Sequence, residues 1–169
     1  DMGKPNTLIL LGTGAADANF GKPASKGKPP KDVRRLVSNF LSPDILIDFN
    51  HQTPDAVDAF GVDRCQVKHL IVSHGHHDHF EPIEILCFAE ALPHPLSVYG
   101  STMVCDALAF CRRQAFDSGS KRFVTQSRPF NIELNTMVPG TTAQVGDTRV
   151  TAVQSNHLMD KLYCIMEQQ

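Results

Sequence analysis

The sequence of 169 residues has no tryptophan, only two tyrosines and no long hydrophobic run. No apolar stretch approaches the roughly 18–20 residues that a membrane-spanning helix needs, and the N-terminus lacks the apolar core and cleavage site of a signal peptide. We therefore expect no contact with a membrane. The charges are nearly balanced, with 16 Lys and Arg against 18 Asp and Glu. This balance argues against a basic nucleic-acid surface covering the whole domain, although a local basic patch is compatible with it.

The cysteines are odd in number and form no close pair of the C-x-x-C kind, so they suggest neither a disulfide framework nor a cysteine zinc site. We expect reduced, mostly buried thiols in a cytoplasmic protein. The five positions are Cys65, Cys87, Cys105, Cys111 and Cys164. Hydrophobic residues make up 41% and charged residues 20% of the chain, a globular composition that fits one domain over residues 1–169.

Strands and helices alternate in the first part of the chain, and strands dominate the second. Apolar runs predict strands near 7–11, 45–47, 70–72 and 96–99. Helix starts are predicted at Thr53-Pro54, at Pro82 and at Ser101, the last helix running to about residue 115 with Met103, Ala107 and Phe110 on one apolar face. Strands follow near 130–134, 142–145, 148–153 and 162–166, with a hairpin across Gly146-Asp147. The fold class is therefore mixed α and β.

One stretch, residues 21–31, has a different composition, with three prolines, two glycines and no large apolar side chain. We expect an exposed, mobile loop. Its basic side chains allow two interpretations, a solvated connector or a loop that guides an anionic substrate. The four lysines concerned are Lys22, Lys26, Lys28 and Lys31.

Histidine is the unusual residue, because four of the eight histidines lie between positions 74 and 79. The segment reads His74-Gly75-His76-His77-Asp78-His79 and follows a buried strand. Imidazole and carboxylate are ligands that suit zinc, iron and manganese. Two histidines at i and i+2 can hold one ion, while the adjacent Asp78 and His79 can hold a second. His77 is expected to point away. His51, His69 and His94 have no partners in the sequence and are expected to be surface or structural residues.

This pattern resembles the signature of the metallo-β-lactamase-fold hydrolases, and other positions agree with it. Residues 10–14, Leu-Leu-Gly-Thr-Gly, are similar to the opening strand and turn of that family. The resemblance implies an αββα sandwich with two zinc ions, although manganese or iron is also possible. It implies that His74, His76 and His157 hold the first ion. It also implies that Asp78 and His79 hold the second, that Asp78 orients the nucleophile, and that Asp48 lies in the outer shell.

The opening turn, the segment 34–39 and the strand that ends at Asp48 are most similar to the phosphodiesterase branch of the family. That branch includes the phosphoribosyl cyclic phosphodiesterases and the tRNA 3′-processing nucleases. The nuclease pattern has a glycine three residues after the last histidine of the signature, where this sequence has Pro82. The bridging aspartate and last histidine of the second half have no counterpart, since only Asp160 and Glu167 follow His157 as carboxylates. The resemblance therefore covers the first half of the fold and a little more, so we expect a sandwich that is incomplete at its C-terminus.

The first functional hypothesis is a metal-dependent hydrolase that uses a metal-activated water on a phosphodiester, either a cyclic phosphate or a nucleic-acid end. The same chemistry fits a carboxyl ester, a lactone or a thioester. A second hypothesis is a non-catalytic metal-binding or interaction domain, and a third is a di-iron redox protein. We expect a homo-oligomer partner or a further C-terminal segment to complete the site, with weak or no hydrolysis by these residues alone.

Overall fold

The computed structural model describes residues 7–15, 32–125, 131–155 and, for the backbone only, 162–168. The predicted lysine-rich loop lies outside these residues, so its role stays a prediction. The described elements are, in chain order, β1 (Leu8–Gly12), β2 (Ser38–Leu41), β3 (Ile45–Ile47), α1 (Thr53–Ala59), a short 3₁₀ helix (Arg64–Gln66), β4 (His69–Ile71), α2 (Pro82–Glu90), β5 (Leu96–Gly100), α3 (Thr102–Cys111), β6 (Gln114–Asp117), β7 (Arg122–Thr125), β8 (Ile132–Thr136), β9 (Thr142–Val145), β10 (Thr148–Gln154) and β11 (Leu162–Gln168).

The main sheet has six strands in the order β1-β2-β3-β4-β5-β8. The first two pairings are antiparallel, and β3, β4, β5 and β8 run parallel to one another. Parallel strands need crossover connections, and α1, α2 and α3 supply them. A second sheet contains β9, β10 and β11 in antiparallel order. The hairpin predicted across residues 146–147 is confirmed, because Val145 pairs with Thr148.

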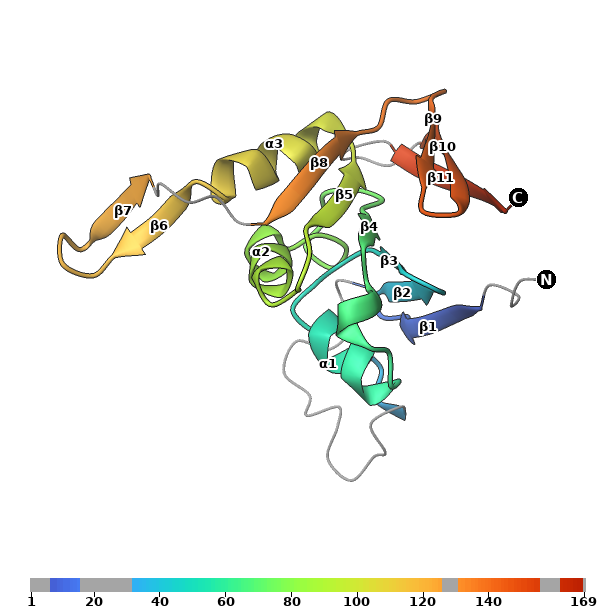
Figure 1. The fold of residues 1–169 in the computed structure, drawn as a ribbon, viewed down its shortest axis with the longest axis horizontal. Coiled ribbons are helices and arrows are strands. Elements are labelled where there is room, and N and C mark those ends of the chain that lie inside the picture. The colour runs from blue at the N-terminus through green and yellow to red at the C-terminus, as the bar shows by residue number, and fades with distance from the viewer. Residues whose placement is uncertain (1–6, 16–31, 126–130, 156–161, 169) are drawn as a thin grey trace.

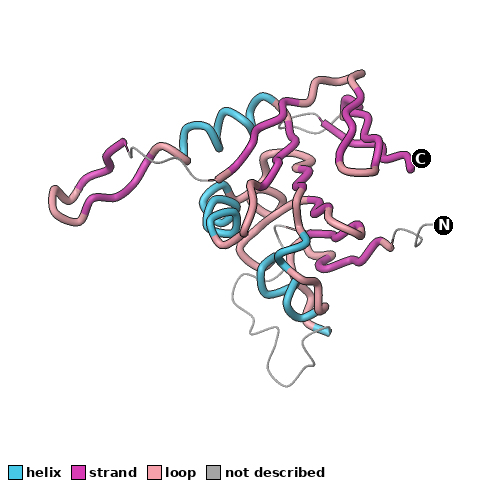
Figure 2. The backbone as a smooth tube through the Cα atoms, in the orientation of Figure 1, coloured by secondary structure: helices cyan, strands magenta, loops and turns pink. Residues whose placement is uncertain are grey.

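The main sheet separates two hydrophobic cores, because successive side chains of a strand point to opposite faces. Leu46, Leu70 and Val98 face the helices and pack with the buried residues of α1, α2 and α3. Ile45 and Ile71 face the other way and pack against Val145, Val150 and Ala152 of the second sheet. The layers are therefore helices, six-stranded sheet and three-stranded sheet, and Figures 1 and 2 show the two sheets and the helices in this arrangement. The prediction of a mixed α/β sandwich is confirmed.

Two glycines allow the first turn to approach the main chain closely. Thr13 N and Gly14 N both donate to the Arg35 carbonyl, at 3.1 and 2.7 Å. A Cβ at Gly12 would collide with the Leu36 carbonyl oxygen, and a Cβ at Gly14 would lie 2.8 Å from the Arg35 oxygen. Any larger residue would thus push β1 away from residues 35–36, which explains the Gly-Thr-Gly sequence.

Helix α3 differs from its prediction. Ser101 caps it as expected, since its hydroxyl accepts from Val104 N. The helix ends at Cys111, however, and buries Val104, Cys105 and Leu108, while Met103 and Phe110 are exposed. The residues after it form β6 and β7, which pair with each other as a separate hairpin. The predicted apolar face is wrong because apolar residues surround much of this helix, so their spacing alone fits more than one face.

The thiols also depart from expectation. Cys105 is buried and Cys111 is half-buried, but Cys65 and Cys87 are exposed. The prediction of mostly buried cysteines is therefore wrong for two of the four whose side chains the structure describes. Within the described ranges, no helix is both long and apolar enough to cross a membrane.

Candidate metal centre

The histidine turn, residues 73–80, follows β4 at the carboxyl end of the parallel strands. Backbone hydrogen bonds near its two ends join it to β5 and to the segment that follows β3. Val72 N donates to the Tyr99 carbonyl at 2.8 Å, and Phe49 N donates to the His79 carbonyl at 2.8 Å. Ligand sites in open α/β sheets commonly lie at this edge, where strand ends and loops meet. The turn thus brings its side chains together on a rigid frame.

Two side chains of the turn form a first pair of nitrogen donors. His74 is buried, and its Nε2 lies 3.1 Å from Nδ1 of His76. Two atoms bound to one tetrahedral zinc at about 2.1 Å lie roughly 3.4 Å apart. The observed separation is close to that value, so both nitrogens can reach a single ion.

Asp78 and His79 form a second pair. Asp78 Oδ2 lies 3.4 Å from His79 Nε2, again close to the separation of two ligands on one ion. Asp78 is only 4% exposed, and its Oδ1 has no hydrogen-bond partner in the part of the chain that the structure describes. An unpaired buried carboxylate oxygen is costly, and a bound cation would remove that cost. The donor set therefore fits a divalent metal.

The two pairs are adjacent. The ring centroids of His74 and His79 are 4.1 Å apart, and those of His74 and His76 are 4.8 Å apart. Among the described residues, no three His, Cys, Asp or Glu side chains form one group that could hold an ion. His157, the expected third ligand of the first pair, lies outside the described residues. Each pair therefore still needs ligands beyond those described.

Asp48 and Ser73 determine which nitrogen of each ring faces the pairs. Asp48 Oδ2 accepts from His79 Nδ1 at 2.7 Å and from the Ser73 hydroxyl at 3.0 Å. The Ser73 oxygen lies 3.0 Å from His74 Nδ1 and can accept from it. A carboxylate only accepts, so the consistent arrangement has a proton on Nδ1 of both rings. Both Nε2 atoms then present a lone pair, the form that binds metals.

The carboxylates of Asp48 and Asp78 also affect the pKa of His79. Burial is the largest single influence and opposes protonation of the imidazole. The hydrogen bond to Asp48 and the charges of Asp48 and Asp78 outweigh it and raise the pKa of His79 above its ordinary value. The environment is therefore negative, which suits a cation.

The comparisons with known proteins bear on the fold. No protein-family model and no curated protein matches the sequence. Among solved structures, the metallo-β-lactamase fold protein YhfI from Bacillus subtilis matches with a TM-score of 0.65 at 17% identity, over 95% of this chain and 56% of that one. The chain has the metallo-β-lactamase fold. A diphosphatase from the PhnP family matches with a TM-score of 0.65 at 15% identity, over 95% and 62% of the two chains. Human tRNase Z, short form, matches with a TM-score of 0.64 at 14% identity, over 95% and 64%.

This chain spans between 56% and 64% of the length of these three metallo-β-lactamase-fold structures. A B3 metallo-β-lactamase matches less extensively, with a TM-score of 0.54 at 18% identity, over 80% of this chain and 52% of its own. The described layers agree with a sandwich of this fold in which helices cover the main sheet.

The other histidines are not members of either pair. His77 is exposed. The His51 ring is 2.8 Å from Glu81 Oε1, and His94 Nε2 is 2.9 Å from the Cys65 carbonyl. His69 lies between the sheets, 3.9 Å from Asp44 Oδ2. The four lysines of the predicted loop lie outside the described residues.

Asn50 is a site residue that sequence reasoning missed. It is fully buried, and its amide donates to the Asp78 carbonyl at 2.8 Å and to the Val37 carbonyl at 2.9 Å. Asn50 thereby fixes the backbone of the histidine turn at Asp78. The only available signal was a polar side chain two residues after the strand end at Asp48.

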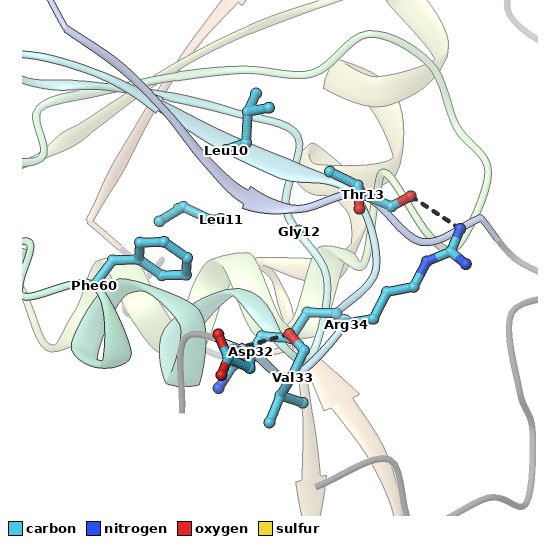
Figure 3. Close-up of a pocket in the computed structure, with 9 residues that line it drawn as sticks. Leu10, Leu11, Gly12, Thr13, Asp32, Val33, Arg34 and Phe60 are labelled. Carbon is cyan, nitrogen blue, oxygen red and sulfur yellow. Dashed lines mark hydrogen bonds between the residues drawn. The ribbon is translucent and has the colours of Figure 1, made fainter. Parts of the chain in front are cut away.

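A cavity of about 310 Å³ lies elsewhere in the domain. Its walls come from β1, residues 32–35 and Phe60, and none of the candidate metal ligands lines it. Figure 3 shows Arg34 at its rim, where Nη2 donates to the Thr13 carbonyl at 3.4 Å. We assign no role in the metal centre to this cavity.

Proposed function

We propose that this chain binds two divalent ions, zinc foremost and manganese or iron as alternatives, and that it belongs to a hydrolase of phosphodiesters. The observation that carries the proposal is the pairing of donors in the histidine turn, together with the unpaired Oδ1 of buried Asp78 and the hydrogen bond from His79 to Asp48. His74 and His76 would hold the first ion together with His157. Asp78 and His79 would hold the second.

Divalent ions held by these residues would lower the pKa of a bound water towards about 7 and would polarise a phosphoryl oxygen. The residues of this chain supply the positioning. Asp48 and Ser73 keep Nδ1 protonated on His79 and His74, so that Nε2 remains a ligand. Asp78 has two carboxylate oxygens, one for an ion and one to accept a hydrogen bond from the attacking water. Asn50 holds the backbone that carries this carboxylate.

The comparisons support a phosphodiester over an acyl substrate. The diphosphatase and the tRNase Z match over 95% of this chain, whereas the β-lactamase matches over 80% with a lower TM-score. A small cyclic phosphate and a nucleic-acid end are both compatible with this evidence. A carboxyl ester, lactone or thioester is the alternative.

The test is a substrate panel on the 169-residue chain loaded with zinc or manganese. The panel contains bis-p-nitrophenyl phosphate, a 2′,3′-cyclic nucleotide, a lactone and a thioester. We expect metal-dependent hydrolysis of the phosphodiesters, at a low rate because the chain spans under two thirds of the length of the solved structures. Asp78→Asn should abolish it, and His77→Ala should leave it unchanged.

Hydrolysis of the lactone or thioester alone would contradict the proposed substrate class. Tight binding of metal without turnover of any substrate would favour the non-catalytic metal-binding domain instead. Metal content measured by elemental analysis on the same samples separates that outcome from a simple failure to bind metal.

A further inference from the structure

The hairpin of β6 and β7 is unlike the rest of the fold, because the main contacts of each strand are with the other. Gln114 pairs with Thr125 and Asp117 with Arg122. Asp117 closes the turn by accepting from Gly119 N at 3.2 Å and from Ser120 N at 2.9 Å. In Figure 1 the hairpin projects beyond the end of α3, away from both sheets. The hairpin is therefore held mainly by its own strand pairing and by the hydrogen bonds of its turn.

Two phenyl rings lie side by side on this hairpin. Phe116 and Phe123 are directly opposite in the register, with ring centroids 5.6 Å apart and planes at 72°. They are 58% and 73% exposed. An isolated two-stranded hairpin is only marginally stable in water, and the facing rings help to stabilise it. Adjacent exposed apolar side chains also mark many interaction sites. The pair is thus a candidate contact surface.

The hairpin that carries the rings is mostly basic, although Arg122 is opposite Asp117 in the register and points to the other face from Phe123. Arg113, Lys121 and Arg122 are exposed on the hairpin or at its base, and Asp117 is the one carboxylate among residues 112–125. Both oxygens of that carboxylate already accept hydrogen bonds in the turn. This local excess stands out in a chain with a net charge of −2. It favours a polyanion and disfavours a contact between the hairpins of two copies, which would bring like charges together.

We propose that the β6–β7 hairpin binds single-stranded nucleic acid, with Phe116 and Phe123 stacking on bases on one face and the basic side chains of the hairpin contacting phosphates. Aromatic stacking combined with a positive surface is the usual basis of sequence-independent single-strand binding. The choice of a nucleic-acid polymer rests on the proposed phosphodiesterase function. The other candidate occupant, a second copy of this chain, is an outcome of the test below.

The hairpin is placed to bind a polymer at a distance from the histidine turn. At the start of α3, Met103 packs so closely on Gly75 of the histidine turn that a Cβ there would collide with its methyl group. The hairpin follows the other end of this helix, whose 10 residues span roughly 15 Å at 1.5 Å per residue. A nucleic-acid strand bound by the hairpin would therefore be held at a distance from the bond that is hydrolysed.

The experiment measures fluorescence anisotropy of a labelled oligouridylate of about 12 nucleotides, a length within the range that one single-strand site covers. The full chain is used in EDTA, so that binding is read without hydrolysis. We expect saturable binding that Phe116→Ala/Phe123→Ala weakens at least fivefold, because stacking contributes about 1–3 kcal/mol per base. Lys121→Gln/Arg122→Gln should lower the slope of log K against log salt by about 1.4, at about 0.7 per phosphate contact.

Matched controls are Ile83→Ala, an exposed apolar residue on α2, and Lys68→Gln, an exposed cation before β4; neither should change binding. Absence of binding at low salt, or equal binding by the phenylalanine variant, would overturn the inference. So would light scattering that shows a dimer abolished by Phe116→Ala/Phe123→Ala. Hydrolysis of bis-p-nitrophenyl phosphate should be the same in all hairpin variants. RNA binding by a chain that binds neither zinc nor manganese would leave this inference standing and defeat only the proposed function.

Discussion

Asp48 Oδ2 lies 2.7 Å from Nδ1 of His79, and this contact joins the end of β3 to the histidine turn. Asp48 has a φ of +61°, in the left-handed region that non-glycine residues seldom occupy and that aspartate tolerates better than most. Its other oxygen, Oδ1, accepts from Ser73 N at 2.8 Å. The unusual backbone conformation directs the carboxylate at both partners. Such strain persists where the surrounding structure fixes it, often at functional sites.

The first prediction concerns this carboxylate. Asp48→Asn keeps the size and the tolerance of a positive φ but removes the charge and one acceptor oxygen. We expect zinc affinity to fall by about 10–100-fold, the usual effect of losing a hydrogen-bond partner of a metal ligand. Competition with a chromophoric chelator measures it. Asp106→Asn, at an exposed position on α3, is the control. Wild-type affinity in Asp48→Asn would refute the outer-shell role.

The second prediction separates neighbouring histidines in the turn. His76 places its Nδ1 3.1 Å from His74 Nε2, whereas His77 is exposed. His76→Ala removes one of few protein ligands and should reduce zinc affinity by more than the roughly 100-fold expected for an outer-shell change. His77→Ala should change it little. Isothermal titration with zinc compares the two variants. Loss of binding in His77→Ala but not in His76→Ala would show that the pairing in the turn is wrong.

The third prediction concerns pH and His69, which begins β4, at the opposite end of the strand from the histidine turn. Burial lowers the pKa of His69 and outweighs the attraction of Asp44. The folded state therefore binds fewer protons than the unfolded state, whose histidine has a pKa of about 6.5. Stability from this group is present above about pH 6.5 and is lost as the pH falls below that value.

Urea unfolding in EDTA at about pH 8 and at about pH 5.5 tests this difference. His69→Gln should lose less stability on acidification than the wild type, because it has no imidazole to protonate. His77→Gln, at an exposed position, should lose as much as the wild type. An equal loss in His69→Gln and the wild type would show that burial of this ring does not govern the acid response.

The sequence predicted most of the strands, the helix starts and the grouping of the histidines, because these features depend on short-range spacing. It did not predict β2, β6 or β7. It could not predict Asn50, whose amide reaches carbonyls 13 and 28 residues away, at Val37 and Asp78. A local sequence pattern cannot predict a hydrogen-bond partner that only the tertiary fold brings into contact. The role of Ser73 in keeping the proton on Nδ1 of His74 could not be predicted for the same reason, since it depends on Asp48, 25 residues away.

The face of α3 and the hairpin after it show a second limit. Met103 and Phe110 have helical spacing with Ala107, yet Val104 and Leu108 are the residues buried. A shift of one residue rotates a helix by about 100°, and apolar residues on both sides allow either face to pack. The strands β6 and β7 have four residues each, too short for alternation to distinguish them from a continued helix.

The last prediction concerns Asp78, whose buried Oδ1 has no partner among the described residues and whose Oδ2 lies 3.4 Å from His79, long for a hydrogen bond. Leaving such a group unpaired costs about 1–3 kcal/mol or more for a charged group. Without metal, Asp78→Asn should therefore raise the free energy of unfolding by part of that amount, because the amide removes the charge but leaves a buried polar oxygen. With zinc, the order should reverse, because the wild type gains stability from binding ions that the variant holds poorly.

Chemical denaturation of both proteins, in EDTA and in excess zinc, gives the four free energies needed. Asp106→Asn removes an exposed carboxylate and should match the wild type in both conditions. A variant that is less stable than the wild type even in EDTA would mean that Asp78 serves the fold itself. The substitution changes the free energy of unfolding in opposite directions in EDTA and in zinc only if the Asp78 carboxylate destabilises the metal-free protein and holds a cation in the metal-bound one.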